Sequence, residues 1–107
     1  MLNELSREIT ETAKSKGWWD EKRSFGELIA LMHSELTEAL EEYRSGRMYT
    51  EVYYSDKYKP EGIPIELADC IIRILDTCGY YGIDIDEAIR IKAQYNTTRP
   101  YKHGKVI

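Results

Sequence analysis

The sequence has no apolar run close to the roughly 20 residues that a helix needs to cross a bilayer. Its N-terminus also lacks the basic stretch followed by an apolar one that marks a secretory signal. We therefore expect a protein that has no membrane partner and works in the cytoplasm. Positive charge is not in excess either, because 15 Lys and Arg stand against 19 Asp and Glu, a net charge of −4. That balance argues against a nucleic-acid backbone as the main partner.

Cysteine is scarce, with only two in 107 residues. Cys70 and Cys78 fall on one predicted helix, about 12 Å apart along its axis, which is too far for a disulfide. We expect both to be small core residues. The length suffices for one domain but not for two, so we expect a single domain over residues 1–107.

The segment 63–79 is the most apolar of the chain and predicts a central helix, with Pro64 at its start and Gly79 at its end. At 100° per residue, apolar side chains cover most of its circumference. One polar strip remains, and it consists of Glu66, Asp69, Arg73, Asp76 and Thr77. This strip either faces water, with Arg73 pairing with Asp69 one turn away, or lines a cavity in which carboxylates hold a cation.

A second helix carries a matching set of carboxylates. Ser24 and Glu27 have the spacing of a capping box, and the apolar period then runs to a break at 45–46. Glu35 and Glu38 lie at the edge of its apolar face, at the same i,i+3 spacing as Glu66 and Asp69 on the central helix. If the two helices are antiparallel neighbours, the pairs converge, and their mutual repulsion calls for a divalent cation. Oxygen ligands without Cys or His favour Mg²⁺ or Mn²⁺ over zinc.

Three further segments have two possible roles each. Trp18 and Trp19 follow a first helix over 2–16, and they either close the end of the bundle or provide a ring that stacks on a nucleobase. The tyrosine-rich connection 46–62 is a subunit contact or a lid over a substrate, and we favour the contact. A last helix runs from Asp84 to about Thr97. It carries donors that suit a polyphosphate, although long side chains can also simply reach solvent; these donors are Lys92, Asn96 and Arg99.

Taken together, these motifs resemble the MazG-like nucleotide pyrophosphohydrolases of the all-α NTP pyrophosphatase group. The resemblance runs from about Gly17 to Lys105 and rests on ELTE at 35–38, ELAD at 66–69, GWWDEKRSFGE at 17–27, the Lys-x-x-x-Asn-x-x-Arg run at 92–99, and RPYKHGK at 99–105. It implies an all-α four-helix bundle, assembled as a homodimer or homotetramer, that hydrolyses nucleoside triphosphates between the α- and β-phosphates. It also implies an aromatic base pocket and a phosphate role for Lys92 and Asn96.

The resulting hypothesis assigns a role to each candidate residue. Mg²⁺, with Mn²⁺ as a substitute, is expected on Glu35, Glu38, Glu66 and Asp69, and Glu38 is our choice of catalytic base. Substrate is expected to contact Trp18 or Trp19 and the three donors of the last helix. Two rivals stay open. The first is a non-catalytic helical interaction module with a solvated acidic strip. The second is a redox-metal bundle, although such bundles carry a Glu-x-x-His motif that neither carboxylate pair has.

Overall fold

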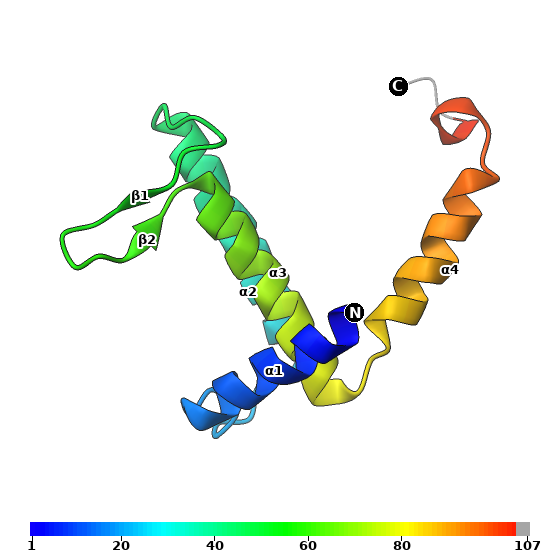
Figure 1. Cartoon of the computed structure of the whole chain (residues 1–107), viewed down its shortest axis with the longest axis horizontal. Coiled ribbons are helices and arrows are strands. Elements are labelled where there is room, and N and C mark those ends of the chain that lie inside the picture. The colour runs from blue at the N-terminus through cyan, green and yellow to red at the C-terminus, as the bar shows by residue number, and fades with distance from the viewer. Residues whose placement is uncertain (105–107) are drawn as a thin grey trace.

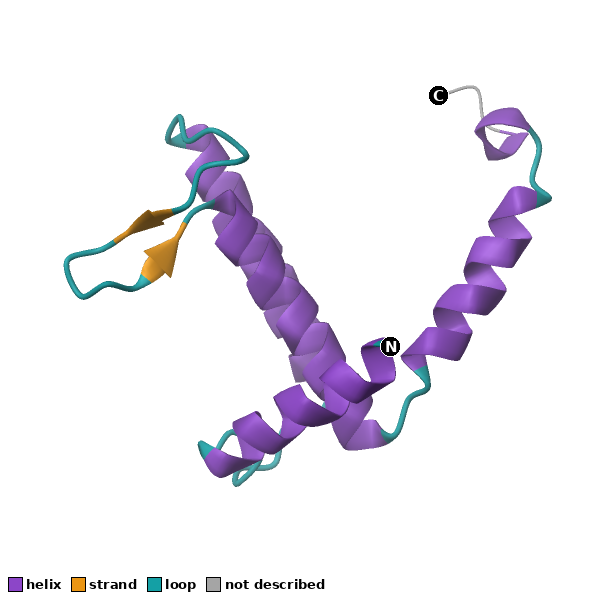
Figure 2. Ribbon diagram, viewed as in Figure 1, coloured by secondary structure: helices purple, strands orange, loops and turns teal. Residues whose placement is uncertain are grey.

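The computed structural model describes residues 1–104. Residues 105–107 lie outside the described residues; they include Lys105, the last residue of the segment that resembles the MazG-like proteins, and Ile107, the last residue of the expected domain. The described chain is mostly helical, with four α-helices and one small antiparallel sheet (Figures 1 and 2). Its elements are α1 (Leu2–Ser15), α2 (Phe25–Arg44), β1 (Tyr53–Tyr54), β2 (Pro60–Glu61), α3 (Ile63–Tyr81), α4 (Ile85–Thr97) and a 3₁₀ turn (Tyr101–Gly104). No helix among the described residues is both long and apolar enough to cross a membrane.

The helix starts agree with the sequence signals. At α2, the Ser24 hydroxyl accepts a hydrogen bond from the Glu27 amide at 3.1 Å, and the Glu27 carboxylate accepts one from the Ser24 amide at 3.2 Å. This is the expected capping box. At α4, the Asp84 carboxylate accepts a hydrogen bond from the Glu87 amide at 3.0 Å. Both starts could be predicted because a cap depends only on residues within one turn.

The expected end of α3 at Gly79 is wrong, because the helix continues to Tyr81 and ends at Gly82, whose φ is +69°. Gly79 instead marks the point where α1 crosses α3. A Cβ at this position would lie 2.8 Å from the Ser6 carbonyl oxygen and would clash with the Thr10 hydroxyl. The missing side chain therefore allows close packing of the two helices.

The prediction that α3 is central is confirmed, since both α1 and α2 pack against it (Figure 1). α2 and α3 run antiparallel, and α1 crosses the C-terminal part of α3. The hydroxyls of Ser6 and Thr10 on α1 donate hydrogen bonds to the carbonyl oxygens of Leu75 and Asp76. The apolar core is small and includes both cysteines, as expected; its buried members are Leu28, Ala39, Ile63, Cys70, Leu75 and Cys78.

The fourth helix departs from the expected bundle. α4 extends away from the other helices (Figure 1), and none of its residues is buried. Only its start is held, because the Asp86 carboxylate accepts hydrogen bonds from the terminal amino group and from the amides of Leu2 and Asn3. These contacts direct α4 past the N-terminus of α1. Within one chain, therefore, α4 does not complete a four-helix bundle.

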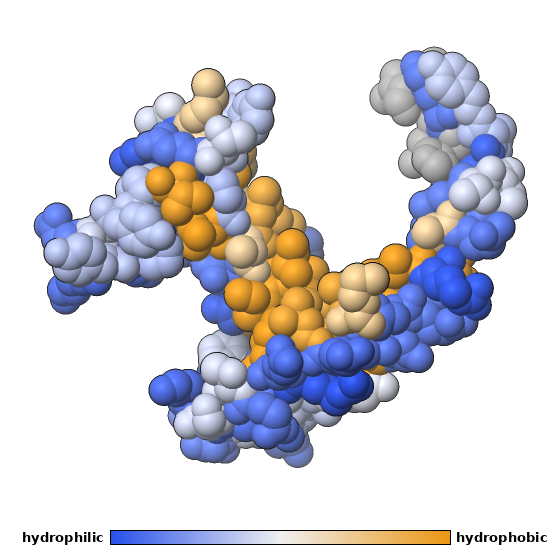
Figure 3. Space-filling model, viewed as in Figure 1, coloured by the Kyte–Doolittle hydropathy of each residue, from blue (hydrophilic) through white to orange (hydrophobic). Residues whose placement is uncertain are grey.

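Large apolar side chains remain on the surface of the single chain. Figure 3 shows them along the face of the central helices and on toward α4. On α3 the exposed residues include Leu67, Ile71 and Ile72, whereas Asp76 and Thr77 of the polar strip are buried. The C-terminal part of the polar strip on α3 thus faces the interior of the chain. Part of the apolar face of the same helix, which we expected to be covered by neighbouring helices, faces outward.

The connection 46–62 contains the hairpin of β1 and β2, which projects from the end of the α2–α3 pair (Figure 1). The Tyr53 hydroxyl lies 2.8 Å from both oxygens of the Glu42 carboxylate, and the Arg47 guanidinium lies 3.6 Å from the centroid of the Tyr53 ring. These contacts fasten the base of the hairpin to α2. Tyr49, Tyr54 and Tyr58 stay exposed, so the subunit contact and the lid both remain predictions.

Candidate metal centre and adjoining pocket

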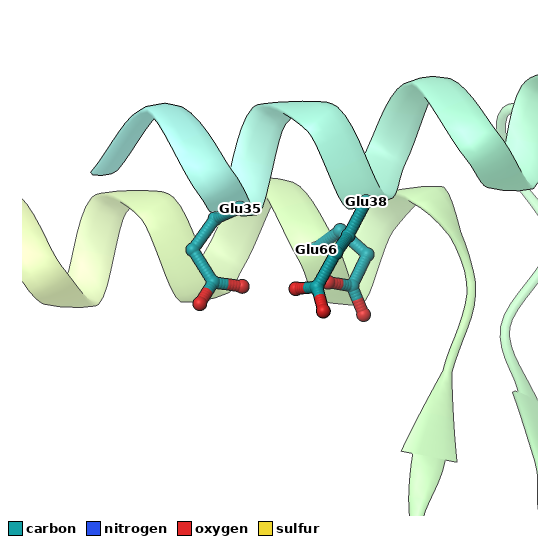
Figure 4. Close-up of side chains that lie close together, drawn as sticks. All are labelled: Glu35, Glu38 and Glu66. Atoms are coloured by element: carbon teal, nitrogen blue, oxygen red, sulfur yellow. The ribbon is translucent and has the colours of Figure 1, made fainter. Parts of the chain in front are cut away.

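Three carboxylates meet where the first turn of α3 passes α2. Glu35, Glu38 and Glu66 each offer one oxygen, and these oxygens all lie within 4.8 Å of one another (Figure 4). Glu35 and Glu38 lie one turn apart on α2, so both point to the same side, where Glu66 approaches from α3. Asp69, one turn after Glu66, is outside this group and lines a pocket beside it together with Glu35.

The three-glutamate cluster is electrostatically strained. Burial, together with hydrogen bonding and negative charge from Glu38, raises the pKa of Glu66 to about 7. Burial and the charge of Glu35 likewise raise the pKa of Asp69. In addition, Glu66 Oε2 is buried and accepts no hydrogen bond from any described residue. A buried carboxylate oxygen without a partner needs either a proton or a cation.

One arginine partly compensates this charge. Arg73 Nε donates a hydrogen bond to Glu35 Oε1 at 2.8 Å, and the Glu35 side chain is only 8% exposed. Burial opposes ionisation of Glu35, yet the hydrogen bonds with Arg73 and Glu38 outweigh it and lower the pKa of Glu35. The sequence had suggested an Arg73–Asp69 pair, but the ion pair runs between helices instead. Helical spacing cannot reveal a partner on another helix, and this partner was therefore missed.

The two tryptophans take different places. The Trp19 ring stacks on Tyr80, with centroids 3.7 Å apart, and its Nε1–H donates to Asp76 Oδ1 at 3.0 Å. Trp19 thus fastens the connection after α1 to the end of α3. The Trp18 ring instead lines the pocket beside Glu35 and Asp69, with the Arg73 guanidinium 5.0 Å from its centroid. Of the pair, Trp18 is the one that a ligand near the carboxylates can reach.

The pocket has a volume of about 360 Å³. Its walls come from α1, α2, α3 and the connection that carries Trp18, and they combine apolar side chains with buried polar ones. The lining residues are Ala13, Trp18, Leu28, Leu31, Glu35, Asp69, Ile72, Arg73, Asp76 and Thr77.

The three donors expected from the last helix lie elsewhere in the single chain. Lys92 and Asn96 are exposed on α4 and Arg99 follows that helix, whereas the cluster lies between α2 and α3 (Figure 1). The Lys92 ammonium lies 5.0 Å from the centroid of the Tyr95 ring, and the Arg99 guanidinium lies 5.6 Å from it. One chain therefore does not bring these residues to the carboxylates.

The residues present fit a hard divalent cation. The cluster offers carboxylate oxygens from Glu35, Glu38 and Glu66, Asp69 follows on the next turn, and Glu66 Oε2 has no competing donor among the described residues. Oxygen donors of this kind suit Mg²⁺ or Mn²⁺. Arg73 occupies one oxygen of Glu35 and leaves the other for a ligand.

We expect Glu66→Gln to stabilise the metal-free protein at pH 8. The pKa of Glu66 is about 7 in the folded chain against an ordinary value of 4.5, so the folded state binds more protons between these values. Stability therefore falls as the pH rises through that window, by about 1–2 kcal/mol after allowance for solvent screening. Gln cannot ionise and escapes this loss.

Thermal unfolding in a chelator checks this prediction. The melting temperature of the variant should exceed that of the wild type by several degrees at pH 8, and the gap should narrow toward pH 5. Glu11→Gln, at an exposed position of α1, is the matched control and should follow the wild type. If the melting temperatures of Glu66→Gln and the wild type depend on pH in the same way, the pKa of Glu66 is not raised in the folded chain.

Comparisons of the chain with protein-family models, with curated proteins and with solved structures found no match. The function is therefore inferred from the residues of this chain and from the sequence resemblance described above.

Proposed function

We propose that this protein is a Mg²⁺-dependent nucleoside triphosphate pyrophosphohydrolase of the MazG-like type, with Mn²⁺ as a possible substitute. The observation that carries the proposal is the convergence of Glu35, Glu38 and Glu66 next to a pocket that also contains Trp18. A role in clearing unwanted nucleotides from the pool is the biological setting that this activity suggests.

In the proposed reaction, water adds across the Pα–O–Pβ bridge, and the products are a nucleoside monophosphate and pyrophosphate. A bound Mg²⁺ would neutralise charge on the phosphate oxygens and lower the pKa of the attacking water. Glu35, Glu66 and Asp69 would hold the ion together with Glu38. The Glu38 carboxylate, which is exposed, would accept the proton of the attacking water.

Self-association would bring the missing donors to the site. The apolar side chains Ile89, Ile91 and Tyr95 are 46%, 56% and 55% exposed on α4, and α3 exposes further apolar residues. Surfaces of this kind are typical of interfaces between subunits. In a homodimer or homotetramer, the helix α4 of one copy would deliver Lys92, Asn96 and Arg99 to the carboxylates of another copy.

Replacing Lys92 by Ala should lower kcat/KM about ten- to hundredfold, since a charge-assisted hydrogen bond to phosphate contributes about 1.5–3 kcal/mol. The rise in melting temperature caused by Mg²⁺ should persist, because the metal ligands lie within one chain. An unchanged kcat/KM with an intact fold would remove α4 from the site.

Mixing two impaired variants tests the shared site further. Lys92→Ala and Glu66→Gln should each have low activity alone. An equimolar mixture, unfolded and refolded together, should recover about a quarter of the wild-type activity, because half of the dimers pair unlike chains and one of their two sites is then intact. Absence of recovery would contradict a site built from two chains.

A panel of nucleoside triphosphates with Mg²⁺, assayed for pyrophosphate and monophosphate, tests the activity itself. We expect equimolar release of the two products from at least one triphosphate, and no release in the presence of a chelator. Release of orthophosphate alone, or no product from any member of the panel, would refute the proposal.

The non-catalytic interaction module is the second candidate, and two observations favour it. α3 and α4 expose apolar side chains that need a partner, and Arg73 neutralises part of the charge of the cluster without a metal ion. Such a module would self-associate, would release no pyrophosphate, and would melt at the same temperature with and without Mg²⁺.

A further inference from the structure

The pocket beside the carboxylates continues inward from them along α3. Glu35 and Asp69 lie at the end nearest the cluster, and Asp76 lies seven residues beyond Asp69, which is about 10 Å along the helix axis. A volume of about 360 Å³ lies within the usual range of small-molecule pockets. A ligand with an anionic end at the cluster would therefore extend its other end toward Asp76.

Asp76 is an unusual residue for the floor of such a pocket, because it is only 7% exposed. Its Oδ1 accepts the hydrogen bond from Trp19 Nε1, and Trp19 is itself fixed by stacking on Tyr80. No described residue donates a hydrogen bond to Oδ2. Oδ2 is not among the buried polar atoms that lack a partner, so this oxygen keeps contact with solvent in the pocket. Because the hydrogen bond from Trp19 fixes the carboxylate, Oδ2 is an acceptor that is held in place and that a ligand in the pocket can reach.

The remaining walls favour a flat ring. The Trp18 ring forms one wall, and its orientation is held by Arg23, whose guanidinium lies 3.9 Å from the ring centroid and donates to the Trp18 carbonyl oxygen at 2.7 Å. Leu28, Leu31 and Ile72 supply apolar contact. An aromatic face, aliphatic walls and one acceptor at the far end match a nucleobase that presents an N–H donor.

Building on the proposed function, we propose that this pocket holds the nucleobase and that Asp76 Oδ2 accepts a hydrogen bond from its exocyclic amino group. The protein then selects bases with an amino group over their oxo counterparts: cytosine over uracil, and adenine over hypoxanthine. The oxo base would place a carbonyl oxygen against Asp76 Oδ2, and neither that carbonyl oxygen nor Oδ2 would then receive a hydrogen bond. Asp76 is thereby the residue that determines base specificity.

Binding of nucleoside monophosphates in the presence of Mg²⁺ tests this inference without any reaction, because a monophosphate has no Pα–O–Pβ bridge to hydrolyse. Isothermal titration should show dCMP binding about ten- to hundredfold more tightly than dUMP, and dAMP more tightly than dIMP by a similar factor, which corresponds to one hydrogen bond to a charged group. In Asp76→Asn the side-chain oxygen can still accept from Trp19, and the amide N–H₂ faces the base. The preference for the amino bases should then disappear or reverse. Asp20→Asn, at an exposed position, is the control and should keep the wild-type preference.

The outcomes separate this inference from the proposed activity. A preference for amino bases without pyrophosphate release would leave the pocket assignment standing and refute the activity. Pyrophosphate release with equal kcat/KM for the amino and oxo triphosphates would leave the activity standing and refute the pocket assignment. Equal affinities for the members of both pairs, or no binding of any monophosphate, would overturn the role of Asp76. The comparison within the wild type decides the matter even if Asp76→Asn does not fold.

Discussion

Replacing both Glu66 and Asp69 by their amides should abolish the rise in melting temperature that Mg²⁺ causes in the wild type. A cation that binds only the folded chain stabilises it by mass action, by about 2.7 kcal/mol at 100 times the dissociation constant. For a domain of this size, that is a rise of about 10 °C or more. The double variant keeps only Glu38 and the Arg73-paired Glu35 and should show neither the rise nor pyrophosphate release.

The double variant should fold, because removing crowded negative charge relieves repulsion in the metal-free cluster. Glu4→Gln with Glu8→Gln, at exposed positions one turn apart on α1, is the matched control and should respond to Mg²⁺ as the wild type does. If the Glu66 and Asp69 double variant also responds as the wild type does, the carboxylates of α2 and α3 do not form the metal site.

Gly79→Ala should lower the free energy of unfolding by about 1–3 kcal/mol. For a domain of this size, each kcal/mol lowers the melting temperature by about 4–8 °C. The added methyl group would lie 2.8 Å from the Ser6 carbonyl oxygen and 2.9 Å from the Ser6 hydroxyl. The carbonyl oxygen is part of the α1 backbone, and the hydroxyl donates a hydrogen bond to α3. Neither atom can move aside, so the two helices must separate to make room for the methyl group.

Gly26→Ala is the matched control, since this residue is also helical. Apart from its chain neighbours and the backbone of its own helix, the nearest atom to its added methyl group is the Ser24 hydroxyl at 3.8 Å. We expect its melting temperature to stay the same or to rise slightly, as alanine favours a helix over glycine. Circular dichroism melts of both variants decide the matter. Equal melting temperatures for the two variants would contradict the close crossing of α1 and α3.

Several features were predictable because local sequence determines them. The capping box at Ser24 needs only Glu27, and the central place of α3 follows from its apolar composition. The convergence of Glu35 and Glu38 with Glu66 needs one further assumption, namely that α2 and α3 are antiparallel neighbours. The connection between the two helices, 45–62, is long and contains the hairpin, so this assumption rests on the tendency of consecutive elements to pack side by side.

The features that sequence reasoning missed depend on contacts between distant segments. Gly79 resembles a helix end until the close approach of α1 is known, and Arg73 has one candidate partner on its own helix and another on α2. Trp18 and Trp19 are adjacent in sequence, yet only the packing of Tyr80 assigns one to the fold and the other to the pocket. The direction of α4 depends on hydrogen bonds between Asp86 and the N-terminus, 85 residues away.

Anomalous diffraction from crystals grown with Mn²⁺ and an α,β-imido triphosphate, which resists hydrolysis, tests the metal centre most directly. The account predicts anomalous density between α2 and α3, in contact with Glu35, Glu38 and Glu66 and with phosphate oxygens of the analogue. Density for the ion at another place, or an analogue bound with no ion beside these three carboxylates, would contradict it.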